Sequence, residues 1–414
     1  MSEAKHDDGD RPPYGEYQID IYRNGILLGE PPILTTNPNG LEAQARKAMQ
    51  PGPFNYIYGG AGEAATMEAN RLAFRQWKLK PRVLKQTKPR NLDVNLFGQT
   101  YPSPLIMAPV GVQSAYHPDG EIGVASACAE LGVPFTLSTA STSTIEEVAA
   151  ASDANTPRWF QLYWPQDNEI TASLLGRAKA NGYTVLIVTL DTFSMAWRPL
   201  DLDGSFLPFI KGQGIQNGLS DPVFRRKLAE ANDGASPEDN PLLAAQAFIS
   251  EAFSGNSHSW DDLEFLREQW DGPIVLKGIL DPEDAKLAVK YGMDGIVVSN
   301  HGGRQLDGAV PSLEMLPQIV DAVGDQITVL FDSGIRTGAD IMKALCLGAK
   351  AVMIGRPVMY GLGIAGKEGA KHVLAGLLAD LDQSMGLSCV KSIVELNRGM
   401  LRRIAYGGDV KSSL

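Results

Sequence analysis

Short runs of hydrophobic residues recur along the middle of the chain, and longer amphipathic stretches separate them. The runs cover residues 105–110, 134–139, 158–164, 184–191, 273–279, 295–300, 328–334 and 351–357. Most are continuous rather than alternating, which is typical of parallel strands buried on both faces. The stretches between them, such as GEIGVASACAELG and EDAKLAVKYG, have a helical pattern and end in a glycine suited to a helix C-terminus.

This alternation predicts an α/β fold of the (β/α)8 or TIM barrel class, which uses eight strands over about 250 residues. We expect an N-terminal helical extension over residues 1–100, the barrel over 101–365, and C-terminal helices and a tail over 366–414. The fourth and fifth runs lie much farther apart than the others. We therefore expect a long insert after strand 4, at about residues 199–260, acting as a lid or an assembly surface.

The composition of the chain limits the kinds of partner that it can bind. Its 414 residues include 37 Lys and Arg against 48 Asp and Glu, a formal net charge of −11. General binding of nucleic acid or of an anionic membrane surface needs a basic face, so we expect neither partner. No apolar stretch approaches the roughly 18–20 residues of a membrane span.

The cysteines and the two ends of the sequence indicate the cellular compartment in which we expect the protein. Cys128, Cys346 and Cys389 form no CxxC pair, so we expect no metal site and no disulfide framework. The polar N-terminus is unlike a signal peptide, which favours a cytoplasmic location. The terminal Ser412–Leu414 is similar to a peroxisomal signal without its basic residue, which leaves the peroxisome as the alternative.

Nearly every run ends in polar residues, and barrels build their active sites at the C-terminal ends of the strands. One polar strand end would mean little, but a succession of them predicts a bound ligand. The glycines and arginines of 332–336 and 355–356 follow strands 7 and 8, where barrels bind phosphate groups. The alternative is that they are turn glycines with solvated arginines.

The chain has five histidines, so any catalytic histidine must be one of them. They are His6, His117, His258, His301 and His372. Only His301 stands at a strand end, in the segment SNHGGRQ, where neighbouring glycines allow a ligand to approach closely. An imidazole also has a pKa suited to proton transfer near neutral pH. We therefore interpret His301 as a general base.

A GxGxxG pattern at residues 361–366 matches the dinucleotide fingerprint but does not follow its strand directly. We interpret it as a glycine-rich start to the C-terminal helices.

The motifs SNHGGRQLDGA, FDSGIRTG and IGRP resemble those of the FMN-dependent α-hydroxy-acid-oxidising family. YIYGGAG, AFRQWKLKPRVL, APVG, LST, QLYW, TLDT and LKGI precede them in the family's order, so the resemblance covers roughly residues 50–400. The insert, from WRPLDL to SHSWDDLEFLRE, most resembles the lactate 2-monooxygenase branch.

The resemblance implies an FMN cofactor, with the isoalloxazine ring at the early strand ends and the phosphate at the last two. The implied cofactor-binding residues are Ala108, Pro109, Val110, Ser138, Gln161, Thr189, Lys277, Ser299, Asp332, Ser333, Gly334, Ile335, Arg336, Gly355 and Arg356.

The resemblance also implies the catalytic roles. His301 would remove the substrate proton, Asp332 would orient and stabilise its imidazolium, and Lys277 would stabilise negative charge on the reduced flavin. Arg198 and Arg304 would clamp the substrate carboxylate. The implied catalytic set is His301, Asp332, Lys277 and Tyr163, and the implied substrate-binding set is Tyr56, Tyr163, Arg198, His301 and Arg304.

Three positions depart from the family pattern and leave the substrate open. Val110 replaces a Thr of several relatives, Trp197 replaces the first Arg of a pair, and Ala140 stands where glycolate oxidase carries a large aromatic residue. L-Lactate is the first choice of substrate, and a larger 2-hydroxy acid is the alternative.

The expected function is therefore oxidation of a small L-2-hydroxy acid with O2, giving acetate, CO2 and water from lactate. The alternatives are an oxidase that releases keto acid and H2O2, a dehydrogenase with another acceptor, and a catalytically silent FMN-binding protein. Another FMN barrel, such as an inosine-phosphate-type dehydrogenase, would need a nucleophilic loop cysteine that the chain lacks at such a position. By analogy with the family, we expect a homotetramer or a larger homo-oligomer.

Overall fold

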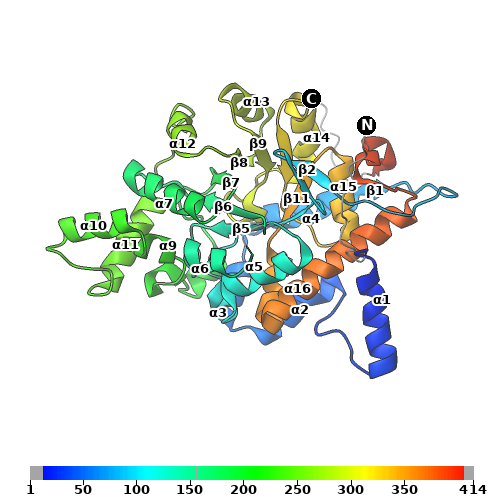
Figure 1. Cartoon of the computed structure of the whole chain (residues 1–414), viewed down its shortest axis with the longest axis horizontal. Coiled ribbons are helices and arrows are strands. Elements are labelled where there is room, and N and C mark those ends of the chain that lie inside the picture. Colours follow the sequence, from blue (N-terminus) through cyan, green and yellow to red (C-terminus); the bar gives the residue numbers. More distant parts are fainter. Residues whose placement is uncertain (1–12, 154–155, 405–414) are drawn as a thin grey trace, which may run out of the picture.

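Eight parallel strands close into a barrel at the centre of the computed structural model, which describes residues 13–153 and 156–404 (Figure 1). The strands are β4 (Leu105–Met107), β5 (Phe135–Ser138), β6 (Arg158–Leu162), β7 (Val185–Thr189), β8 (Ile274–Ile279), β9 (Gly295–Val298), β10 (Thr328–Phe331) and β11 (Ala351–Ile354). They pair in chain order, and β11 closes the ring against β4. The predicted (β/α)8 barrel is therefore confirmed.

Helices return the chain from the end of each strand to the start of the next. They are α5 (Gly120–Leu131), α6 (Ile145–Ala150), α7 (Asn168–Ala180), α12 (Leu263–Gln269), α13 (Pro282–Lys290), α14 (Ser312–Val323) and α15 (Gly338–Cys346). The final helix, α16 (Arg356–Leu387), follows β11. The side chains of Asp167, Asp281 and Thr337 each accept a hydrogen bond from the first turn of their helix, which fixes where the helix begins.

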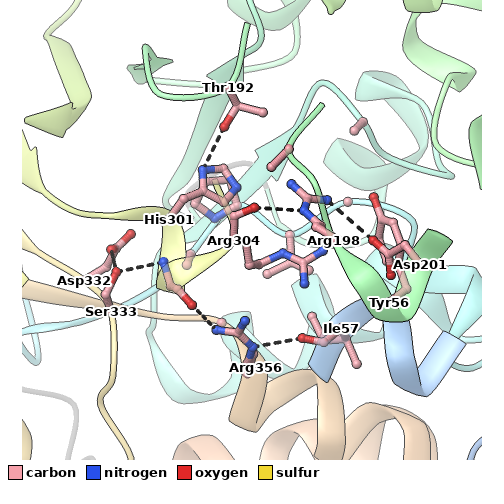
Figure 2. Close-up of a pocket in the computed structure, with 18 of the residues that line it drawn as sticks. Tyr56, Ile57, Thr192, Arg198, Asp201, His301, Arg304, Asp332, Ser333 and Arg356 are labelled. Carbon is pink, nitrogen blue, oxygen red and sulfur yellow. Dashed lines mark hydrogen bonds and ion pairs between the residues drawn. The ribbon is translucent and has the colours of Figure 1, made fainter. Parts of the chain in front are cut away.

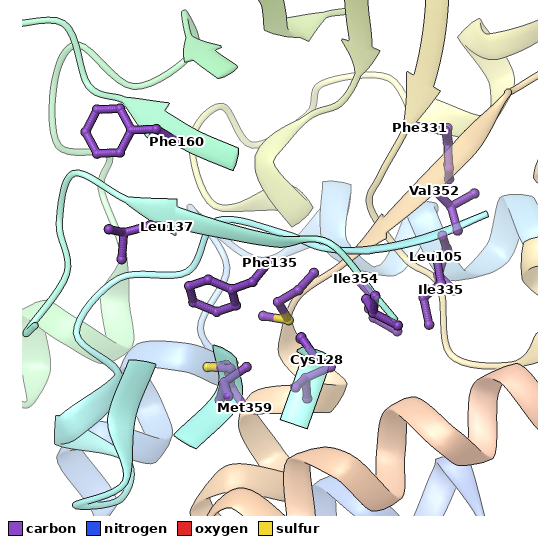
Figure 3. Close-up of a cluster of buried hydrophobic side chains, with 14 of the residues drawn as sticks. Leu105, Cys128, Phe135, Leu137, Phe160, Phe331, Ile335, Val352, Ile354 and Met359 are labelled. Carbon is purple, nitrogen blue, oxygen red and sulfur yellow. The ribbon is translucent and has the colours of Figure 1, made fainter. Parts of the chain in front are cut away.

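The core has two parts because successive residues of a strand point to opposite faces. Leu105 and Met107 face the surrounding helices in the larger part, some of whose residues Figure 3 shows, whereas Ile106 belongs to a smaller cluster. That smaller cluster also contains Trp159 and residues of the hairpin β2 (Val94–Leu96) and β3 (Gln99–Tyr101). The hairpin's Phe97 contacts Gly295, the first residue of β9, so the hairpin fills the N-terminal end of the barrel and leaves the other end for a site.

Helices before the barrel cover one side of it. They are α1 (Glu16–Arg23), η1 (Asn24–Leu28), α2 (Pro38–Ala48), α3 (Pro51–Tyr58) and α4 (Ala65–Gln76). Figure 1 shows α1 standing away from the body, and none of its residues is buried. The strand β1 (Trp77–Leu79) pairs with β12 (Leu401–Arg403), which joins the N-terminal extension to the other end of the described chain.

The insert between β7 and β8 has an inner and an outer part. The inner part contains α8 (Pro199–Asp203) and η3 (Pro208–Lys211) and lines the cavity described below. The outer part contains α9 (Gln216–Leu219), α10 (Pro222–Ala231) and α11 (Pro241–Ala252), which Figure 1 shows at one end of the long axis. Phe224 and Phe248 pack edge to face between α10 and α11, so the outer part has apolar packing of its own.

The GxGxxG pattern lies inside α16, where Ala365 and Gly366 interrupt the helical geometry. Gly361 and Gly369 pack backbone to backbone across this kink. These glycines therefore serve packing within α16. The shorter turns are η2 (Gln113–Ala115), η4 (His301–Gly303), η5 (Ile393–Glu395) and η6 (Arg398–Met400).

Within residues 13–153 and 156–404, no helix combines the length and apolarity needed to cross a membrane. No group of three metal-ligating side chains forms in this part of the chain either. His6 and the terminal Ser412–Leu414 lie outside the described residues.

Candidate active site

A cavity of about 480 Å³ lies at the C-terminal ends of the strands, under the inner part of the insert (Figure 2). Most of the residues expected at the site from the sequence line it. They are Tyr56, Ala108, Pro109, Val110, Tyr163, Arg198, Lys277, His301, Arg304, Asp332, Ser333, Gly334, Ile335, Arg336, Gly355 and Arg356. The strand-end pattern therefore marks residues that meet in one place.

Four expected residues are buried and are not among those that line this cavity, namely Ser138, Gln161, Thr189 and Ser299. Ser138 donates a hydrogen bond of 2.7 Å from its hydroxyl to Oε1 of Gln161, which leaves the buried Gln161 Nε2 without a partner among the described residues. Ser299 Oγ accepts from the backbone N–H of His301 at 3.0 Å. Ser299 thus holds the backbone of His301, and Gln161 Nε2 is a buried donor left for a ligand.

The candidate base, His301, is held in an unusual backbone conformation. It lies three residues after the end of β9 and has a φ of 56°, a region that non-glycine residues adopt rarely. Its Nδ1 lies 2.8 Å from Asp191 Oδ1 and 3.0 Å from Thr192 Oγ1. Because a carboxylate only accepts hydrogen bonds, the proton belongs on Nδ1. Nε2, which no hydrogen bond from the described residues engages, is therefore free to accept a proton.

The expectation that Asp332 orients His301 is wrong. Asp332 Oδ2 lies 3.5 Å from Lys277 Nζ, and its Oδ1 accepts a hydrogen bond of 2.7 Å from Ser333. Asp191 takes the role instead, because it lies two residues after β7 and its Oδ1 contacts Nδ1 of the imidazole at 2.8 Å. The sequence signal for Asp191 was its position at the end of the fourth hydrophobic run, in TLDT.

The electrostatics keep His301 neutral and Asp191 charged. Burial lowers the pKa of His301, and the charge of Lys277 lowers it further, against the opposing effect of Asp191. Burial alone would raise the pKa of Asp191, but its interaction with His301, the charge of Lys277 and the hydrogen bonds from His301 and Thr192 hold it well below its usual range. A neutral imidazole beside a fixed carboxylate is the protonation state that a general base needs.

Two guanidinium groups face the same part of the cavity. Arg198 donates from Nε to the carbonyl of Arg304 at 2.9 Å, and Arg304 donates to the carbonyl of Gly59 at 2.7 Å while lying 5.2 Å from the centre of the Tyr56 ring. Burial and the charge of Arg304 both lower the pKa of Arg198. Two cations held this close in a buried wall favour an anionic ligand.

The corner after β10 and β11 carries a second pair of arginines. Arg356 donates to the carbonyls of Ile57, Gly59 and Gly302 at 2.7–3.0 Å, so it also joins the N-terminal extension to the barrel. Burial lowers the pKa of both Arg356 and Arg336. No ion pair with a described residue reaches either of them, which suits a phosphate group as the missing counter-charge.

Lys277 lies between the two acidic groups of the site. Its side chain is 4% exposed, and burial alone would lower its pKa, but Asp332 and Asp191 raise it above the ordinary value. Lys277 therefore stays charged. Ser333 links Asp332 to the base loop by donating to the carboxylate and accepting from the backbone N–H of Gly302 at 2.9 Å.

These residues fit FMN. Arg336 and Arg356 offer charge for its phosphate, the unpartnered Gln161 Nε2 offers a donor for a ring carbonyl, and Lys277 offers a cation near a ring that gains negative charge. Ala108 and Val110 supply apolar surface at the end of β4.

Comparisons with known proteins agree with this arrangement. The family described as FMN-dependent dehydrogenase matches residues 45–403. An FMN-dependent α-hydroxy acid dehydrogenase of Penicillium citrinum is 57% identical over 401 residues, covering 97% of this chain and 99% of that protein. An L-lactate oxidase of Lysinibacillus sphaericus is 41% identical over 353 residues, covering 85% and 89%. A crystal structure of mandelate oxidase superposes with a TM-score of 0.77 at 36% identity, covering 90% and 99%.

The family match spans the barrel and both flanking segments, and these relatives cover most of the chain at well over 30% identity. The chain therefore belongs to the FMN-dependent dehydrogenase family and is an FMN-dependent α-hydroxy-acid oxidoreductase.

Proposed function

We propose that this enzyme oxidises a small L-2-hydroxy acid, with L-lactate as the first candidate, and passes the electrons to O2. The observation that carries the proposal is the free Nε2 of His301 in a cavity whose wall also holds Arg198 and Arg304. A base and a carboxylate clamp at one cavity suit a substrate with a carboxylate next to the carbon that reacts.

In the proposed reaction, the residues at the cavity bind the substrate and accept its proton. Arg198 and Arg304 bind the carboxylate, and the hydroxyl groups of Tyr56 and Tyr163 hydrogen-bond the substrate oxygens. His301 accepts a proton at Nε2, and the imidazolium that results is stabilised by Asp191 at Nδ1.

Bound FMN supplies the acceptor for the two electrons that leave the substrate. Lys277 holds a positive charge at the strand ends, where it opposes the build-up of negative charge.

The inner part of the insert can affect how quickly the products leave the cavity. Leu202, Phe206 and Phe209 line the cavity from outside the barrel, so this segment can delay release. With delayed release, pyruvate and H2O2 react together and leave as acetate, CO2 and water. With rapid release, both escape as in a simple oxidase.

Two measurements test the proposal. L-Lactate added without oxygen should bleach the bound flavin, and air should restore its colour rapidly. Acetate formed in equal amount to the lactate consumed supports the monooxygenase outcome, whereas stoichiometric H2O2 contradicts it.

An acceptor other than O2 is the second candidate, since the relative at 57% identity is named a dehydrogenase. Slow reoxidation in air, with fast reoxidation by an artificial acceptor, would establish that alternative.

A further inference from the structure

The wall of the active-site cavity contains two buried polar atoms that the mechanism above does not use. They are the hydroxyl of Tyr116 and Oδ1 of Asp201, and neither has a hydrogen-bond partner among the described residues. Tyr116 follows η2 in the loop after the first barrel strand and is 6% exposed. Asp201 belongs to α8 of the insert, and its Oδ2 lies 3.9 Å from Arg198 Nη1 (Figure 2).

Buried polar groups in proteins are almost always paired, so two unpaired groups at one cavity point to a ligand group that completes them. Tyr116 comes from a barrel loop and Asp201 from helix α8 of the insert, and both line the same cavity. A tyrosine hydroxyl can donate and accept, whereas a carboxylate only accepts. Together they suit a ligand hydroxyl or another hydrogen-bond donor.

The surroundings keep the phenol of Tyr116 in its neutral form. Burial raises its pKa well above the ordinary value, and the charged or polar groups that act on it include Tyr56, Arg304 and Asp201. These groups belong to the carboxylate clamp or lie beside it. The unpaired atoms therefore lie beside the residues proposed to bind the substrate carboxylate rather than in a separate site.

We propose that Tyr116 and Asp201 form a polar subsite for the side chain of the substrate, so that the enzyme prefers 2-hydroxy acids whose side chain carries a second hydroxyl group. This inference rests on the proposed function. Arg198 and Arg304 take the carboxylate and His301 takes the proton, which leaves the side chain as the part of the substrate for this wall. The carboxylate of Asp201 also repels a second carboxylate, so dicarboxylic 2-hydroxy acids are disfavoured.

The test compares matched acids by steady-state kinetics with an electron acceptor and by anaerobic reduction of the bound flavin. The pairs are L-lactate with L-glycerate, L-2-hydroxybutanoate with L-2,4-dihydroxybutanoate, and L-mandelate with L-4-hydroxymandelate. In at least one pair, the hydroxylated acid should have a kcat/KM about tenfold higher or more, because a site built around a hydroxyl discriminates against its absence.

Tyr116→Phe should lower kcat/KM for the preferred hydroxylated acid about tenfold more than for its plain partner. The matched control is Tyr360→Phe, because the Tyr360 hydroxyl is also buried and unpartnered but lies outside this cavity. The control should leave the ratio within each pair unchanged. Equal loss for both members of a pair in Tyr116→Phe would show a structural role and overturn the subsite.

Asp201→Asn provides a second readout if Tyr116→Phe does not hold FMN. Removing the charge should raise kcat/KM for L-malate about tenfold relative to L-lactate. No change in that ratio, or no preference within any pair in the unmodified enzyme, overturns the proposal. If no 2-hydroxy acid reduces the flavin, the proposed function fails. If plain acids reduce it as well as their hydroxylated partners do, only the subsite fails.

Discussion

At the scale of single residues, the proposed reaction depends on the tautomer of His301. Asp191 accepts the Nδ1 proton at 2.8 Å, so Nε2 is left unprotonated in the cavity. Asp332 is the neighbouring acid along the rim, but it pairs with Lys277. The two carboxylates therefore have separable roles.

Asp191→Asn should lower the rate of flavin reduction by about 10²–10⁴-fold. An amide can donate to Nδ1, which favours the tautomer with the proton on Nε2 and removes the base. Asp332→Asn makes the same change of shape and charge beside Lys277 and should lower the rate of flavin reduction less than Asp191→Asn does. Stopped-flow reduction of both variants checks the order, and a larger loss in Asp332→Asn would contradict the assignment of Asp191.

The pH dependence follows from the lowered pKa of His301. Catalysis needs the neutral imidazole, so activity is lost as falling pH protonates it. Because burial and Lys277 lower its pKa below the ordinary 6.5, kcat/KM for the 2-hydroxy acid should stay level on descending through pH 7 and fall only below 6.5. A profile of kcat/KM against pH checks this, and an acidic limb centred at pH 7 or above would show that the imidazole is not held neutral.

The sequence could place the strand ends but not the contacts between them. His301, Arg304 and Arg336 were found because parallel strands in a barrel bring their carboxyl ends to one rim. The family resemblance implied Asp332 as the partner of His301, whereas Asp191, two residues beyond β7, makes that contact in the structure. Tyr116 carries no motif, and its place in the cavity depends on the turn η2.

At the scale of elements, the kink in α16 depends on close contact between two glycines. Gly361 and Gly369 pack backbone to backbone, and a Cβ on either would overlap the carbonyl oxygen of the other. Gly376 lies farther along the same helix and has open space where a Cβ would be. The kink thus requires glycine at some positions of α16 but not at all of them.

Gly361→Ala should lower the free energy of unfolding by about 1–3 kcal/mol, because the added methyl forces the two halves of α16 apart. Gly376→Ala is the control and should leave stability unchanged or raise it by about 0.5–1 kcal/mol, since alanine favours helix. Thermal and urea unfolding measure both. Equal effects of the two substitutions would show that the kink does not depend on close glycine packing.

At the scale of the whole molecule, an acidic chain with a net charge of −11 concentrates buried cations at one end of its barrel. Arg336 and Arg356 have lowered pKa values because burial disfavours their charge and no carboxylate among the described residues pairs with them. Arg356 also holds the N-terminal extension through three backbone carbonyls. Binding of the FMN phosphate beside Arg336 and Arg356 should therefore stabilise the fold as well as position the cofactor.

FMN should raise the unfolding temperature of the cofactor-free protein more than riboflavin does, because riboflavin has the same ring but lacks the phosphate that neutralises these arginines. Ligand at 100 times its Kd adds about 2.7 kcal/mol to the free energy of unfolding. Differential scanning calorimetry with each flavin measures the two shifts, and Arg336→Met is the matched variant. Removing Arg336 should reduce the shift with FMN toward the shift with riboflavin, because the ring contacts remain and one phosphate contact is lost. Equal shifts with FMN and riboflavin in the unmodified protein would place the phosphate away from Arg336 and Arg356, and the counter-charge of this corner would then have to come from elsewhere.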